Sequence, residues 1–136
     1  MATPTAAKAK IATPKKKKDL KIDSGILHVQ TTDNNTILTL VDENGNKVLG
    51  WGTGKLGYKW SKKSTPYAAE VLTKQLLKEA QGLWLKEIGV IFRWCGLARD
   101  GVFKGINEIG LIDIKYIKED TAIQFGGCKW KRKKRV

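Results

Sequence analysis

The chain has few of the residues that build catalytic and metal centres. It contains one histidine, His28, and two cysteines, Cys95 and Cys128, that lie far apart in the sequence. The cysteines have neither metal-ligand spacing nor the spacing of a disulfide framework, so no zinc site is expected and a reducing compartment is the default. His28 falls within a predicted strand, where a packed or surface position is a commoner role than that of a general base.

Enzyme motifs are also missing. The glycine-rich run "GWGTGKLG" (50–57) has the spacing of neither a P-loop nor a dinucleotide fingerprint. The serines have no evident base beside them in sequence, and the acids are scattered singly among lysines. We therefore expect no enzyme, no catalytic residue, no metal and no cofactor.

Long apolar runs are absent. No run approaches ~18 residues, so no membrane-spanning helix is expected. The first 19 residues, "MATPTAAKAKIATPKKKKD", have no apolar signal core and no Arg, and only weakly resemble an organellar transit peptide.

Acidic residues are scarce: 13 stand against 26 Lys and Arg, for a net charge of +13. Residues 1–21 hold seven Lys and one Asp, and residues 129–135 hold six basic residues, so each tail carries +6. The remaining 13 basic and 12 acidic residues leave a net charge of +1 between the tails. A nearly neutral domain with two cationic tails is typical of a protein that binds a polyanion.

The pattern between the tails predicts alternating strands and helices. Three strands are expected at 26–32, 36–41 and about 47–51, because β-branched runs are separated by the turn sequences "DNN" and "ENGN". Residues 50–64 are expected to form a loop. A helix follows from "STP" (64–66) to about Gly82, with Thr65 as its cap.

The second half repeats this alternation. A buried strand is expected at 86–92, a loop over 93–101, a helix over about 99–109 that Gly110 ends, and a last strand of alternating apolar and polar residues at 111–119. The order βββαβαβ predicts an α/β domain with a mixed sheet. We therefore expect a flexible basic extension over 1–23, a single domain over 24–128 and a basic tail over 129–136.

Two loops have the composition of nucleic-acid contacts. Residues 50–64 mix lysines and glycines with three aromatic rings, which could stack on unpaired bases or fold back onto the core. Just before the helix, Ser61, Ser64 and Thr65 could help bind a phosphate or simply cap it. In the second loop Arg93 and Arg99 bracket Gly96, although Arg99 could instead pair with Asp100.

Four ordered motifs resemble one family. They are "GILHVQTTDNNTILTLVDENGNKV" (25–48), "KLGYKWSKKSTPYAAE" (55–70), "GLARDGVFKGINEIGL" (96–111) and "GGCKWKRKKRV" (126–136). In order and spacing they resemble small-subunit ribosomal protein family eleven, of the bacterial or organellar type. The resemblance covers about residues 24–136.

This resemblance implies a mixed five-stranded sheet with two helices in a ribonuclease H-like architecture. It also implies a structural role in translation, as a ribonucleoprotein constituent that binds small-subunit rRNA in the platform near the mRNA exit. Expected neighbours are small-subunit ribosomal proteins of families six, seven, eighteen and twenty-one, depending on lineage, and mRNA near the exit; no membrane is expected.

Carried over by position, the rRNA contacts fall on the first turn, the two loops and the C-terminal tail. The expected rRNA-binding residues are Asn34, Asn35, Thr36, Lys55, Lys59, Trp60, Ser61, Lys62, Lys63, Ser64, Thr65, Arg93, Gly96, Arg99, Cys128, Lys129, Trp130, Lys131, Arg132, Lys133, Lys134 and Arg135.

The chain departs from the family pattern in both loops. Trp60 and Trp94 stand where the family usually has Gly, Cys95 replaces a Pro, and Ala98 replaces a third Gly. These changes put close approach of the backbone to phosphate in doubt. Such divergence is typical of a mitochondrial or plastid ribosome, with the cytoplasm of an AT-rich bacterium as the alternative.

Two other functions are compatible with the sequence. The chain could be a free RNA-binding module or translational regulator that uses the same fold. A nuclease of the ribonuclease H type would need two or three acids converging on a metal, and no such cluster is evident in the sequence.

Overall fold

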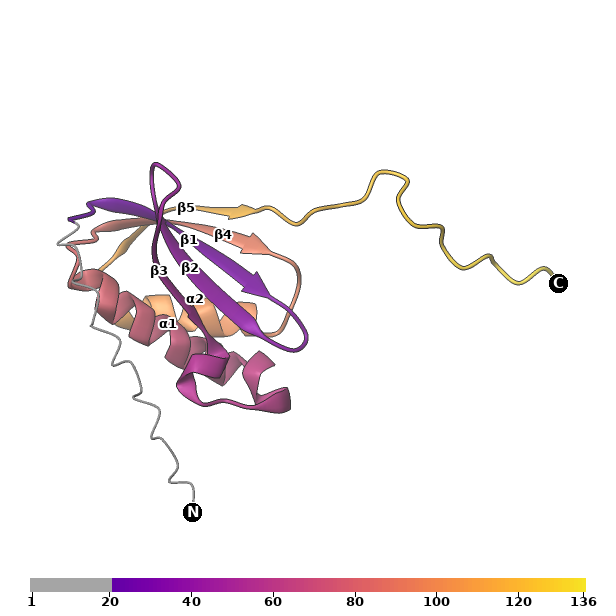
Figure 1. The fold of residues 1–136 in the computed structure, drawn as a ribbon, viewed down its shortest axis with the longest axis horizontal. Helices are drawn as coiled ribbons and strands as arrows, with labels where there is room; N and C mark the ends of the chain where they lie inside the picture. The colour runs from indigo at the N-terminus through magenta and orange to yellow at the C-terminus, as the bar shows by residue number, and fades with distance from the viewer. Residues whose placement is uncertain (1–20) are drawn as a thin grey trace, which may run out of the picture.

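The computed structural model describes residues 21–136, which form a five-stranded sheet with two helices on one face (Figure 1). The sheet order is β3-β2-β1-β4-β5. The strands are β1 (Ser24–Thr31), β2 (Thr36–Asp42), β3 (Lys47–Gly52), β4 (Glu87–Arg93) and β5 (Asp113–Glu119), and the helices are α1 (Pro66–Gln81) and α2 (Ala98–Ile109). Strands β1, β2 and β3 pair antiparallel, whereas β1, β4 and β5 pair parallel. The expected mixed α/β sheet is confirmed.

The core lies between the sheet and the two helices. Every second residue of the inner strands points into it, as strand periodicity requires. These buried side chains meet a leucine-rich face of α1 and the apolar face of α2. The sheet contributes Leu27, Val29, Leu38, Leu40, Ile88, Val90 and Phe92, and the helices contribute Leu72, Leu76, Leu77, Val102 and Ile106.

The two helices pack closely because α2 presents glycines to α1. A Cβ placed on Gly101 would lie 2.0 Å from the Pro66 carbonyl oxygen, and one on Gly105 would lie 2.9 Å from the Thr73 Cβ. The helix ends match the expectations: the Thr65 side chain accepts a hydrogen bond from the Ala68 N–H, and Gly110 ends α2 in the left-handed conformation at φ 59°.

Strand β5 differs from the sequence expectation. It begins at Asp113 rather than 111, and all seven of its residues are exposed although its pattern alternates. The reason is its position: β5 is an edge strand paired only with β4, and no β5 residue joins the core beneath the helices. Apolar alternation therefore predicted the strand correctly but not a buried face.

The stretch expected to be a loop over residues 50–64 is also more regular than its sequence indicates. Strand β3 extends to Gly52, and two 3-10 helices follow, η1 (Thr53–Leu56) and η2 (Trp60–Ser64). The expectation of an irregular loop was wrong, because helices of four and five residues are too short to leave a periodic apolar pattern.

Residues 1–20, most of the expected N-terminal extension, lie outside the described residues. Within residues 21–136, no helix has the length and apolar character needed to cross a membrane.

Candidate RNA-binding surface

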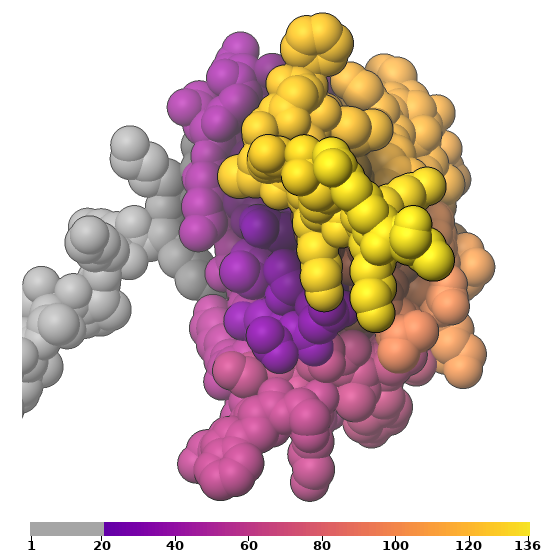
Figure 2. All heavy atoms as spheres, turned by 90° about the vertical axis from the view of Figure 1, so that its right-hand side faces the viewer, coloured from indigo at the N-terminus to yellow at the C-terminus, as the bar shows by residue number. Residues whose placement is uncertain are grey.

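The parallel pairing of β1, β4 and β5 brings the segments that follow these strands to one end of the sheet. We call this surface the loop end and define it as residues 32–35, 53–65, 93–99 and 120–136. Figure 2 shows the molecule from this end. The C-terminal tail, in yellow, crosses in front of the β1–β2 turn, and the segment that contains the two 3-10 helices (residues 53–65, here called the 3-10 segment) lies below in magenta. All four segments expected to contact rRNA are therefore found at one end of the molecule.

Asn35 links the β1–β2 turn to the 3-10 segment. Its side-chain oxygen accepts hydrogen bonds from the Thr36 N–H at 2.8 Å and from the Thr53 hydroxyl at 2.6 Å. On the other side, the Asn35 N–H donates to the Thr32 hydroxyl at 3.0 Å. Asn35 thus stabilises the conformation of the turn and its contact with the 3-10 segment, while its neighbour Asn34 is exposed to solvent.

The 3-10 segment presents cations around a hollow of about 560 Å³. The hollow is lined by residues 57–62, which include Lys59, Trp60 and Lys62. The Thr65 hydroxyl donates to the Lys62 carbonyl at 2.8 Å and also caps α1, so it fixes where this segment meets the helix.

The three rings of this region have different environments. Trp51 packs against the core, donates its ring N–H to Glu79 at 3.1 Å, and has the Lys55 ammonium 3.5 Å above its ring. Tyr58 is half-buried, whereas Trp60 is 84% exposed. Of the two roles that the sequence left open, Trp51 has the packed one, and Trp60 is free to meet a base.

Trp94, in the second loop, has its backbone held from two sides. Its N–H donates to the Thr121 hydroxyl at 3.1 Å, and its carbonyl accepts from the Thr31 hydroxyl at 3.3 Å and from the Arg99 guanidinium. The loop is thereby attached to the end of β1 and to the residues after β5.

Two ion pairs reinforce this attachment. Arg93 pairs with Asp120 at 3.2 Å, and Arg99 pairs with Glu119 at 2.9 Å. The hydrogen bond from Arg99, a second one from Thr121 and the charge of Arg99 together lower the pKa of Glu119. The ion pair of Arg99 with Asp100, which the sequence left as an alternative, is not formed. Arg99 pairs instead with Glu119, the last residue of the edge strand β5.

The partners Glu119, Asp120 and Thr121 were missed by the sequence reasoning. A signal for them existed, because adjacent parallel strands bring the residues after them together, and Phe92 of β4 is in register with Glu119 of β5. Both arginines therefore help to shape the loop, and Arg93, which is exposed, also remains accessible to RNA.

The C-terminal tail leaves the domain beyond β5 and extends away from it (Figure 1). Residues 128–136 are all exposed, and Trp130 is 83% exposed. The tail therefore presents six basic side chains and one indole to solvent beside the loops.

The expected contact residues divide by exposure. Those exposed are Asn34, Lys55, Lys59, Trp60, Ser61, Lys62, Arg93, Cys128, Lys129, Trp130, Lys131, Arg132, Lys133, Lys134 and Arg135. Those partly exposed are Asn35, Lys63, Ser64, Thr65, Gly96 and Arg99. Thr36 is fully buried, and its hydroxyl has no hydrogen-bond partner, so its side chain does not reach the surface in this conformation.

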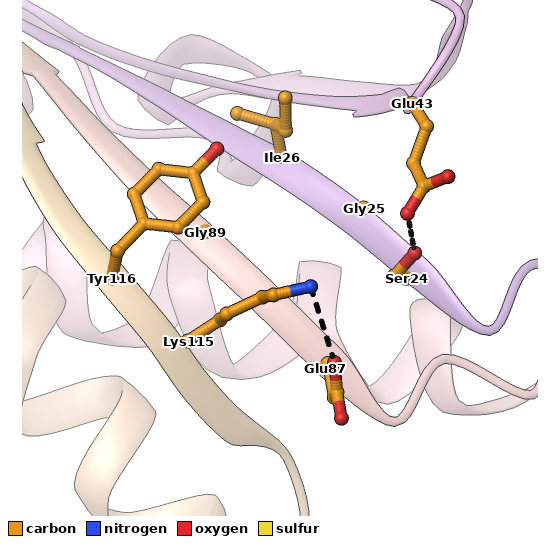
Figure 3. A pocket seen from close by; sticks show the side chains of 8 residues that line it. All are labelled: Ser24, Gly25, Ile26, Glu43, Glu87, Gly89, Lys115 and Tyr116. Carbon is orange, nitrogen blue, oxygen red and sulfur yellow. Dashed lines mark hydrogen bonds and ion pairs between the residues drawn. The ribbon is translucent and has the colours of Figure 1, made fainter.

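Two acidic residues, Glu43 and Glu87, and one lysine, Lys115, are among the residues that line a separate small pocket of about 130 Å³ near the opposite ends of the parallel strands (Figure 3). Its two carboxylates already have partners: Glu43 accepts from the Ser24 hydroxyl, and Glu87 pairs with Lys115 at 3.9 Å. Within residues 21–136, no three His, Cys, Asp or Glu side chains are grouped to hold a metal ion. The pocket thus lacks the converging acids that a ribonuclease H-type centre requires.

Comparison with known proteins places these features in a family. The family model described as ribosomal protein S11 matches residues 25–135. The small ribosomal subunit protein uS11 of Kosmotoga olearia is 41% identical over 122 residues, covering 90% of this chain and 93% of the relative. The uS11 of Thermotoga maritima is 35% identical with the same coverage, and the uS11c of Oltmannsiellopsis viridis is 38% identical over 89% of this chain and 93% of the relative. The chain belongs to the ribosomal protein S11 family.

Proposed function

We propose that this chain is a structural, non-enzymatic constituent of the small ribosomal subunit and binds small-subunit rRNA through its loop end. Membership of the S11 family supports the ribosomal role. The observation that carries the proposed surface is the convergence of four separate segments at the loop end, three of which carry exposed cations. The domain between the two tails has a net charge of only +1, so the requirements of folding do not explain why cations gather at the loop end.

The mechanism is neutralisation of phosphates with release of counterions. The exposed lysines of η2 and of the tail are compact charges that suit this role, because they contact the backbone of RNA without reading its bases. The folded domain sets the position of the loops, and the tail becomes ordered when it lies along RNA.

The proposal extends to the place of the chain in the ribosome. We assign it to the platform, near the mRNA exit, beside ribosomal proteins of families six, seven, eighteen and twenty-one. A mitochondrial or plastid ribosome accounts best for the substitutions at Trp60 and Trp94, and the cytoplasm of an AT-rich bacterium is the alternative. N-terminal sequencing of the mature protein tests this: removal of a leader supports an organelle, and an intact N-terminus in bacterial ribosomes supports the alternative.

Sedimentation through a high-salt sucrose gradient tests the ribosomal role. A structural constituent stays with the small subunit at stoichiometric levels and is found with it at every stage of growth. A free RNA-binding regulator would instead wash into the top fractions, and that result would overturn the proposal.

A further inference from the structure

We propose that Trp94 stacks on one unpaired nucleobase of the bound RNA, in the groove between the β4–α2 loop and the C-terminal tail. This inference rests on the proposed function and assigns a contact that none of the charged residues supplies. Phosphate neutralisation does not distinguish paired from unpaired nucleotides, whereas stacking on an indole ring requires a base that is unpaired and unstacked.

The backbone of Trp94 is the first observation. Its φ is 63°, in the left-handed region that bulky side chains rarely adopt. Such a conformation persists only where surrounding groups impose it, and here the hydrogen bonds to Thr31, Arg99 and Thr121 do so. The strained residue is therefore held in place by its neighbours, and its side chain projects from a fixed point of the loop.

The groove is the second observation. Trp94 is 53% exposed and lines two adjoining hollows, one of about 290 Å³ towards β1 and one of about 570 Å³ towards the tail. Trp130 lines the larger hollow as well, together with Thr121 and Gln124, among others. The larger volume falls within the ~300–1,000 Å³ that small ligands usually occupy.

Charge complementarity favours RNA as the occupant. The groove adjoins residues 129–135, which carry six basic side chains and no acid. Its own lining includes two carboxylates, Glu119 and Asp120, but each is paired with an arginine, so the unpaired charge beside the groove is that of the basic tail. An apolar side chain of a neighbouring protein would gain nothing from these charges, whereas a nucleotide presents a phosphate to them and a flat base to the indole. Gln124 lines the larger hollow, and its side-chain amide can bond the edge of a base.

The test measures binding of the full chain to two fluorescently labelled single-stranded oligonucleotides of equal length. One carries uracil bases, and the other is abasic with the same phosphates. Trp94→Gly suits the left-handed backbone and should fold, so it removes the ring without a cavity. We expect it to weaken binding to the uracil strand by about 5- to 150-fold, the factor that stacking of one base provides, and to leave binding to the abasic strand unchanged. Trp94→Phe keeps a ring and should retain most of the affinity.

Trp84→Gly is the matched control. Trp84 is 65% exposed with φ 67°, and it lies in the turn between α1 and β4, away from the loop end. The Trp84→Gly variant should bind both strands as the parent does.

The stacking proposal is overturned if Trp94→Gly binds the uracil strand like the parent, or if it loses equal affinity for both strands. Unchanged binding of the uracil strand would indicate that a neighbouring protein, and not RNA, occupies the groove. The salt dependence of binding reports separately on phosphate neutralisation, so the two proposals can fail independently.

Discussion

The hydroxyl of Thr53 donates a hydrogen bond of 2.6 Å to the side-chain oxygen of Asn35. These residues belong to two segments that the sequence marks separately as RNA contacts, the β1–β2 turn and the stretch after β3. Thr53 is fully buried and Asn35 is partly buried, so the donor hydroxyl has no access to water as an alternative partner. It holds the two segments at a constant separation, which a surface that follows an RNA backbone requires.

Loss of this bond should destabilise the domain. We expect Asn35→Ala to lower the free energy of unfolding by about 1–3 kcal/mol, because the buried Thr53 hydroxyl and the Thr36 N–H both lose their acceptor. Urea denaturation measures the change. Asn34→Ala, at the exposed neighbouring position, should stay within about 0.5 kcal/mol of the parent. Equal stability of the two variants would show that Asn35 does not join the segments.

The ion pair between Arg99 and Glu119 should make stability depend on acid pH. Because the pKa of Glu119 is lowered in the folded chain, its contribution is present above the unfolded value of about 4.5 and is lost as the pH falls through the folded pKa. We expect Glu119→Gln to be less stable than the parent near neutral pH and to approach it as the pH falls below 4.5. Denaturant titrations at several pH values measure this difference.

Asp100→Asn is the control for that experiment. Asp100 is next to Arg99 in the sequence but is not its ion-pair partner in the structure. A pH-dependent loss in Asp100→Asn that equals the loss in Glu119→Gln would contradict the assigned pairing.

Helices α1 and α2 pack so closely at Gly101 that a side chain at this position should destabilise the domain. A Cβ there would lie 2.0 Å from the Pro66 carbonyl oxygen, which is backbone and cannot rotate away. We expect Gly101→Ala to cost about 1–3 kcal/mol or more of unfolding free energy, measured by thermal or urea denaturation. Gly54→Ala meets no atom within 4 Å and should be close to neutral. A neutral Gly101→Ala would mean that the helices do not pack this closely.

Trp60 should contribute to binding and not to stability. Its ring is 84% exposed, and its φ is 61°, so Trp60→Gly removes a backbone strain without emptying a core. We expect the variant to be as stable as the parent or more stable by about 1 kcal/mol, while it binds single-stranded RNA more weakly. Denaturation and binding measured on the same preparation test both parts. A clear loss of stability would show that the ring packs on the protein.

The sequence predicted the sheet, both helices and the helix caps, because each depends on local periodicity and on residues such as Thr65 and Gly110 that act at one position. It did not predict that β5 has no buried face, since burial depends on which strand ends up at the edge. The two 3-10 helices escaped notice for a different reason, their shortness.

The candidate surface was predictable in outline but not in its internal bonds. Lysines and glycines in the loops indicated RNA, and strand order placed the loops together. The roles of Arg93 and Arg99 were less predictable, because their partners Asp120 and Glu119 lie 27 and 20 residues away in the sequence. The departures from glycine at Trp60 and Trp94 raised doubt about backbone approach; the structure keeps glycine-type dihedral angles at both positions and adds a ring.

The salt dependence of rRNA binding tests the loop end most directly. The triple variant Lys59→Gln, Lys62→Gln, Lys63→Gln removes three charges from η2 and the residue before it. The control triple Lys47→Gln, Lys78→Gln, Lys86→Gln removes the same charge from the start of β3, the last turn of α1 and the residue before β4. Our account predicts that the slope of log K against log salt concentration falls by up to about 2 in the first variant and stays unchanged in the control. Equal slopes in the two variants would contradict a localised RNA-binding surface.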